Sequence, residues 1–95
     1  MHILLIEDDL SVADYIKKGL NQENHVVDHF VDGKKGLLSA TLENYDVMVI
    51  DRMLPNVDGL TIVRTLRASN ITTPILILSA LTDVNQRVEG LQRNH

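Results

Sequence analysis

Short apolar runs alternate along the chain with longer stretches in which apolar residues recur every three or four positions. The short runs predict strands, and the longer stretches predict amphipathic helices. The expected strands are His2–Ile6, His25–Phe30, Asp46–Ile50 and Ile75–Leu78. The expected helices are Leu10–Gln22, Gly33–Leu42, Leu60–Ala68 and a last one from about Asp83 to the end of the chain. Their expected inward positions include Leu10, Ala13, Ile16 and Leu20 in the first helix, Gly36, Leu37 and Ala40 in the second, and Ile62, Val63 and Leu66 in the third.

Alternation of apolar strands with helices predicts an α/β fold: an open parallel sheet with helices on both faces. In such sheets ligands bind beyond the carboxyl ends of the strands. Polar residues stand at three of those ends: Glu7, Asp8 and Asp9 after the first strand, Asp51 after the third and Ser79 after the fourth. We expect these side chains to share one crevice.

Composition narrows the class of protein. With 95 residues and no cysteine, the chain is expected to be one small domain without disulfides, thiolate metal sites or a cysteine nucleophile. The net charge of −4 and the lack of a Lys/Arg cluster disfavour direct nucleic-acid binding. No apolar run approaches the roughly 20 residues of a membrane helix, so we expect a cytoplasmic protein that does not contact a membrane.

Several carboxylates in one crevice repel one another and need a cation or a raised pKa. Oxygen ligands without histidine or cysteine suit Mg²⁺. A carboxylate can also act as a nucleophile that forms an aspartyl phosphate, with a hydroxyl such as that of Ser79 bonding the phosphoryl group. The residues by themselves therefore predict Mg²⁺-dependent phosphorylation of a carboxylate, or phosphate handling of a related kind.

Three motifs carry a resemblance to a known family. They are Ile3-Leu4-Leu5-Ile6-Glu7-Asp8-Asp9, the run from Asp51 to Gly59 with Pro55 and Asp58-Gly59, and Pro74–Ala80. In these segments the chain resembles the receiver domain of bacterial two-component response regulators, most like the OmpR/PhoB type. The resemblance implies a flavodoxin-like or CheY-like doubly wound fold, with residues 1–95 forming one receiver domain.

The resemblance also implies roles for single residues. Asp51 would be the phosphoacceptor, and Ser79 the switch hydroxyl that turns toward the phosphate. Glu7, Asp8, Asp51 and the Met53 carbonyl would bind Mg²⁺. The protein would be a signalling domain, phosphorylated by a sensor histidine kinase, that assists its own phosphorylation and dephosphorylation without being a turnover enzyme.

The family pattern continues past His95 with a lysine, an aromatic switch residue, a fifth strand and helix, and a DNA-binding domain. We therefore expect an incomplete receiver domain that lacks the last βα unit and would reach DNA only through a missing C-terminal domain. Ile75–Leu78 would then form an apolar sheet edge, which predicts self-association by edge pairing or by exchange of the last helix.

Other interpretations explain fewer residues. A haloacid-dehalogenase-like phosphatase needs a second aspartate two positions after Asp51, where this chain has Met53. A flavodoxin-like nucleotide binder needs a phosphate-binding Gly/Ser/Thr loop in place of the three acids after the first strand. A purely structural oligomer without signalling competence stays open. Asp9 is expected to cap a helix or to face solvent, and His25 and His29 are expected to be hydrogen-bonded or solvent-facing and not metal ligands.

Overall fold

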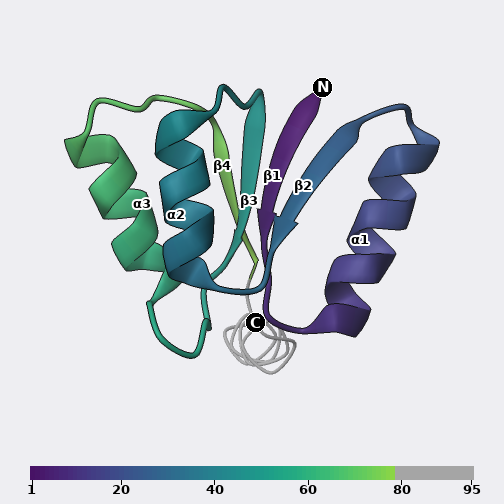
Figure 1. Ribbon diagram of the computed structural model, residues 1–95, viewed down its shortest axis with the longest axis horizontal. Coiled ribbons are helices and arrows are strands. Elements are labelled where there is room, and N and C mark those ends of the chain that lie inside the picture. Colours follow the sequence, from purple (N-terminus) through teal and green to yellow (C-terminus); the bar gives the residue numbers. More distant parts are fainter. Residues whose placement is uncertain (79–95) are drawn as a thin grey trace, which may run out of the picture.

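The computed structural model describes residues 1–78, in which strands and helices alternate regularly (Figure 1). The elements are β1 (His2–Ile6), α1 (Leu10–Gln22), β2 (Val26–Phe30), α2 (Gly33–Leu42), β3 (Val47–Asp51), α3 (Gly59–Ala68) and β4 (Ile75–Leu78). Each agrees with the predicted element to within one residue. The helix predicted from about Asp83 onward lies outside the described residues.

The small differences in strand boundaries have local causes. His25 was expected in β2, but its amide donates to the Leu20 carbonyl and belongs to the turn that ends α1. Asp51 was expected just beyond β3. It forms the last residue of that strand because it stands opposite Leu78 of β4. The phosphoacceptor candidate is therefore fixed by sheet pairing.

All pairings in the sheet are parallel, and the strand order is β2-β1-β3-β4. The chain passes from β2 across β1 to build β3, so the winding direction reverses between β1 and β3. Ile6 at the end of β1 pairs with Phe30 on one side and with Ile50 on the other. Such a reversal leaves a crevice at the carboxyl ends of the two strands.

Helices cover both faces of the sheet, with α1 on one side and α2 and α3 on the other (Figure 1). The α1 side buries Ile3, Leu5, Ala13 and Val49. The other side buries Leu4, Ile6, Ala40, Tyr45, Met48, Ile50, Leu54, Ile62 and Leu66. Successive residues of β1 alternate between the two clusters, as the two-residue period of a strand requires. This arrangement confirms the predicted open parallel α/β fold.

Aspartate side chains begin all three described helices. Asp9 accepts from the Ser11 and Val12 amides at 2.9 and 3.2 Å, and Asp32 and Asp58 cap α2 and α3 in the same way. Asp9 thus has the predicted capping role. Leu10, in contrast, was expected to point inward and is exposed, because it opens the helix at the rim of the sheet, one turn before the buried Ala13.

A hydrogen-bonded network links β1, β2 and α2 to Tyr45, which lies two residues before β3. The Tyr45 hydroxyl donates to Asp28 at 2.8 Å, and His2 Nε2 lies 2.8 Å from the same oxygen. The hydrogen bond from Tyr45 is the largest cause of the lowered pKa of Asp28. Since that bond uses the phenolic proton, the Ser39 hydroxyl 2.7 Å from the Tyr45 oxygen is the donor of their bond. The network satisfies the polar end of a buried tyrosine.

Among residues 1–78, no helix is long and apolar enough to cross a membrane.

Two helical glycines should respond to the same substitution in opposite directions. A Cβ at Gly36 would lie 2.5 Å from Cδ1 of the buried Ile6, whereas a Cβ at Gly19 would meet nothing within 4 Å. We expect Gly36→Ala to lower the free energy of unfolding by about 1–3 kcal/mol through overpacking. Gly19→Ala should raise it by about 0.5–1 kcal/mol through helix propensity. Urea denaturation measures both, and equal effects of the two changes would contradict the packing of α2 on β1.

Candidate functional site

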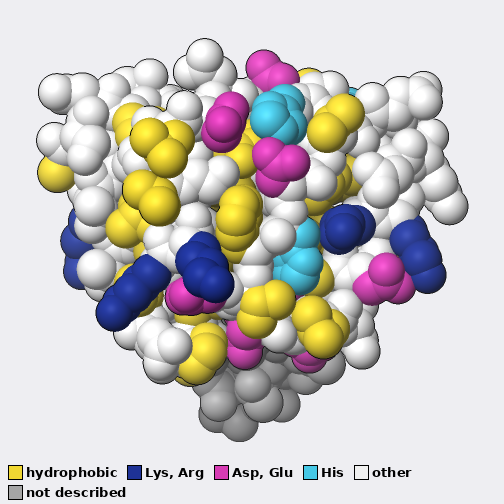
Figure 2. All heavy atoms as spheres, in the orientation of Figure 1, with side chains coloured by type: hydrophobic (Ala, Val, Ile, Leu, Met, Phe, Trp, Pro, Cys, Tyr) yellow, Lys and Arg dark blue, Asp and Glu magenta, His cyan; other side chains and the backbone are white. Residues whose placement is uncertain are grey.

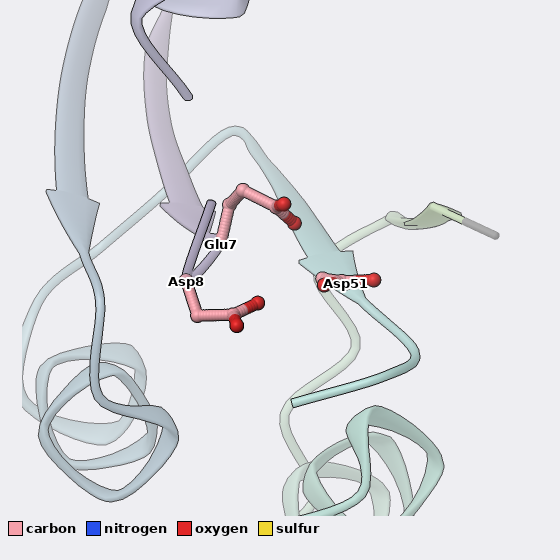
Figure 3. A group of neighbouring side chains, drawn as sticks. All are labelled: Glu7, Asp8 and Asp51. Carbon is pink, nitrogen blue, oxygen red and sulfur yellow. The ribbon is translucent and has the colours of Figure 1, made fainter. Parts of the chain in front are cut away.

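Three carboxylates meet at the carboxyl edge of the sheet. Glu7 and Asp8 follow β1, Asp51 ends β3, and the side chains point toward one another (Figure 3). Each contributes one oxygen to a group in which all the oxygens lie within 4.8 Å of one another. Of the residues predicted to share one crevice, Glu7, Asp8 and Asp51 do so, whereas Asp9 caps α1.

Two of these acids are buried. The exposed fraction is 5% for Glu7 and 8% for Asp51, while Asp8 is half-buried. Burial, and after it the hydrogen bond to Asp51 and the charge of Asp51, raise the pKa of Glu7 to about 8. The Asp9 amide, 3.4 Å from Oε1 of Glu7, opposes this shift. Without a cation, a proton on Glu7 is what allows the two acids to stay together.

The backbone of Glu7 is held from β2. Its amide donates to the Phe30 carbonyl at 3.0 Å, and its carbonyl accepts from His29 Nε2 at 2.8 Å. His29 therefore positions the loop that carries Glu7 and Asp8. Sequence reasoning expected only that this histidine would find some partner, because nothing in the sequence shows that it reaches a carbonyl 22 residues away.

His25 and His29 do not form a common site. The N-terminal amine donates to Nδ1 of His25 at 2.9 Å, whereas His29 is used at the Glu7 carbonyl. Both histidines are hydrogen-bonded, as the sequence analysis predicted.

Asp51 is fixed by the loop that follows it. Its Oδ1 accepts from the Met53 amide at 3.1 Å, and the Gly59 amide donates to the Arg52 carbonyl at 3.0 Å. A Cβ at Gly59 would lie 2.2 Å from the Asp51 carbonyl oxygen. Only glycine lets the start of α3 approach β3 this closely.

Met53 brings its backbone, not its side chain, to this region. The side chain is exposed, and the amide is bonded to Asp51. Its predicted use as a carbonyl ligand stays a prediction. Ser79, the predicted switch hydroxyl, lies outside the described residues.

The donor set fits Mg²⁺. All three side chains offer carboxylate oxygens, which hard divalent cations prefer. These oxygens all lie within 4.8 Å of one another, so one divalent cation with its waters could reach all three. A divalent charge would also remove the repulsion that raises the pKa of Glu7. Glu7, Asp8 and Asp51 are therefore a chemically suitable cation site.

Comparison with known proteins gives the class of this domain. The family model described as "Response regulator receiver domain" matches residues 3–95, and the chain belongs to this family of signalling domains. A solved structure of the receiver domain of the Francisella response regulator 1452 superimposes with a TM-score of 0.81 at 38% identity. That match covers 96% of this chain and 75% of the other.

Curated relatives are longer proteins. Response regulator ArlR of Staphylococcus saprophyticus is 45% identical over 89 residues, which cover 94% of this chain and 40% of the relative. Transcriptional regulatory protein CusR of Escherichia coli K12 is 41% identical over 92 residues, covering 97% of this chain and 40% of the relative. The chain thus spans about 40% of the length of the curated relatives it matches.

The raised pKa of Glu7 predicts how stability depends on pH when divalent cations are removed. The folded pKa of about 8 exceeds the ordinary value of 4.5, so the folded state binds the proton more tightly than the unfolded state. The stabilisation is complete below pH 4.5 and is lost as the pH rises through about 8. We expect the free energy of unfolding in a chelator to fall over this window, as followed by urea denaturation.

Glu7→Gln should flatten that pH dependence, because the amide does not titrate. Glu23→Gln, at an exposed position after α1, serves as the matched control and should leave the slope unchanged. An unaltered slope in Glu7→Gln would show that another group is responsible.

Proposed function

We propose that this domain is the phosphoacceptor module of a two-component response regulator, with Asp51 as the residue phosphorylated by a sensor histidine kinase. One observation carries the proposal: the Asp51 carboxylate ends a central strand, with one oxygen held by the Met53 amide and two further carboxylates beside it. The same position at the carboxyl edge of the sheet is the usual place for ligands in this class of fold.

In the proposed reaction an oxygen of Asp51 attacks the phosphorus of a phosphohistidine on the kinase. An O–P bond forms on Asp51 while the N–P bond breaks, and the departing imidazole keeps the electron pair and takes up a proton. The Met53 amide fixes one carboxylate oxygen, so that the attacking group is oriented before the donor arrives. Glu7 would lose its proton when a cation binds, because the proton and the cation each neutralise the same pair of buried acids.

Mg²⁺, when bound, would neutralise the phosphoryl oxygens during transfer. Glu7, Asp8 and Asp51 would hold it, together with the Met53 carbonyl that the family resemblance implies. Ser79 keeps its proposed role as the switch hydroxyl. On this proposal the domain assists its own phosphorylation and dephosphorylation but does not turn over a separate substrate.

For the whole protein we propose control of transcription in the cytoplasm. The support is that relatives such as CusR are transcriptional regulatory proteins. The present chain carries a net charge of −4, which does not suit direct contact with DNA. DNA binding would therefore belong to the part of such regulators that this chain does not span.

Phosphorylation should depend on Asp51 and on Mg²⁺. We expect incubation with acetyl phosphate and Mg²⁺ to add one phosphoryl group, seen by intact mass spectrometry, because the Asp51 oxygen is the positioned nucleophile. Asp51→Asn should abolish the added mass, and Asp14→Asn, an exposed carboxylate on α1, should retain it. Persistent phosphorylation of Asp51→Asn would refute the assignment.

Mg²⁺ should stabilise the fold independently of any phosphorylation. Because the ion relieves repulsion within the acidic cluster and binds only the folded chain, millimolar Mg²⁺ should raise the Tm. Asp8→Asn should remove most of this rise, while Asp14→Asn should keep it. Circular dichroism provides the measurement, and an equal rise in the Asp8 variant would exclude Asp8 as a ligand.

Self-association through β4 is a further part of the proposal. Among the described strands β4 lies at one edge of the sheet, and Leu76 has an exposed fraction of 63%. An apolar strand at an edge can pair with another chain, and a lysine placed there blocks such pairing. Leu76→Lys is therefore the variant in which this contact should be lost.

A further inference from the structure

Helix α2 is apolar on two opposite sides. Its inner side, with Gly36, Leu37 and Ala40, packs on the sheet. On the outer side Leu38 and Leu42, one turn apart, have exposed fractions of 59% and 73%. Surface helices normally present polar residues on that side. Hydrophobic side chains are prominent on this face of the molecule, close to basic ones (Figure 2).

The outer side of α2 forms one wall of a shallow groove. The groove has a volume of about 280 Å³ and is lined by Phe30, Lys35, Leu38, Ser39, Leu42 and Glu43. Phe30 comes from β2, the edge strand beside α2. Ser39 is held by its hydrogen bond to Tyr45, so the middle of the groove is built from ordered groups. Along α2, the charged residues Lys35 and Glu43 flank the two leucines and Ser39.

The charges in this groove have a self-complementary pattern. Lys35 stands four positions before Ser39, and Glu43 stands four positions after it. If a second α2 lies antiparallel across a two-fold axis at Ser39, each Lys35 faces Glu43 of the other copy. The same operation brings Leu38 and Leu42 of the two copies together. Isologous contacts of this kind need one patch that matches itself.

We propose that the outer side of α2 docks a second copy of this chain in an antiparallel, two-fold arrangement. The leucines provide the attraction, and the paired Lys35 and Glu43 charges fix orientation and register. A contact made by a single helix pair is smaller than a standard interface, so the dimer is weak and forms at high protein concentration. Glu7, Asp8 and Asp51 do not line the groove, and the proposed contact does not require phosphorylation.

Charge reversal tests the arrangement most directly. All variants are made in the Leu76→Lys background, so that pairing through β4 does not contribute, and sedimentation equilibrium gives the dissociation constant. Lys35→Glu or Glu43→Lys alone creates two like-charge pairs, which should weaken the dimer roughly tenfold. The double variant Lys35→Glu/Glu43→Lys restores opposite charges and should return to near the starting value. Circular dichroism confirms that each variant folds.

Removal of apolar surface provides the second test. Leu38→Ser should weaken association, whereas Tyr15→Ser, at an exposed position on α1, should not. Failure of the double charge reversal to restore the dimer would overturn the proposed register. A background variant that stays monomeric at all concentrations, or a dimer insensitive to Leu38→Ser, would overturn the α2 contact. Phosphorylation of Asp51 is measured separately and would survive either failure.

Discussion

Repulsion between buried carboxylates is the constraint on which the rest of this structure depends. Adjacent parallel strands bring Glu7 and Asp51 to one edge of the sheet, where each is less than one-tenth exposed. Burial and the neighbouring acid raise the pKa of Glu7 to about 8. The fold tolerates this arrangement only with a proton or a cation in place. On our proposal, the same free-energy cost makes the site responsive to Mg²⁺ and to a phosphoryl group.

Rigid backbone contacts keep the acids together against that repulsion. His29 and Phe30 of β2 hold the backbone of Glu7, and the Met53 amide holds the side chain of Asp51. Gly59 then allows α3 to start directly against the Asp51 carbonyl. A site that must bind a phosphoryl donor in a defined orientation needs this kind of preorganisation. The stability of the sheet is thus used to hold a locally unfavourable group of charges.

The outer side of α2 differs from the acidic site in what its residues contribute to the fold. Its outer leucines contribute little to the fold, because their side chains are largely in solvent. Contact with another molecule would bury them. The opposite charges of Lys35 and Glu43 at the two ends of the groove favour a partner with the reverse order of charges, which an antiparallel second copy supplies. Association and phosphorylation would then use separate regions of one small domain.

Much of this protein could be predicted from its sequence. Apolar periodicity gave every described element to within a residue, because burial on both faces of a parallel sheet imposes a pattern that local composition reveals. Polar residues at strand ends and the Asp51–Gly59 motif identified the acidic site and the family. Tertiary structure alone decided that His29 holds the Glu7 carbonyl, that Gly59 is required by a close backbone approach and that Leu10 is exposed. These features depend on register and packing between distant segments, which no local pattern in the chain records.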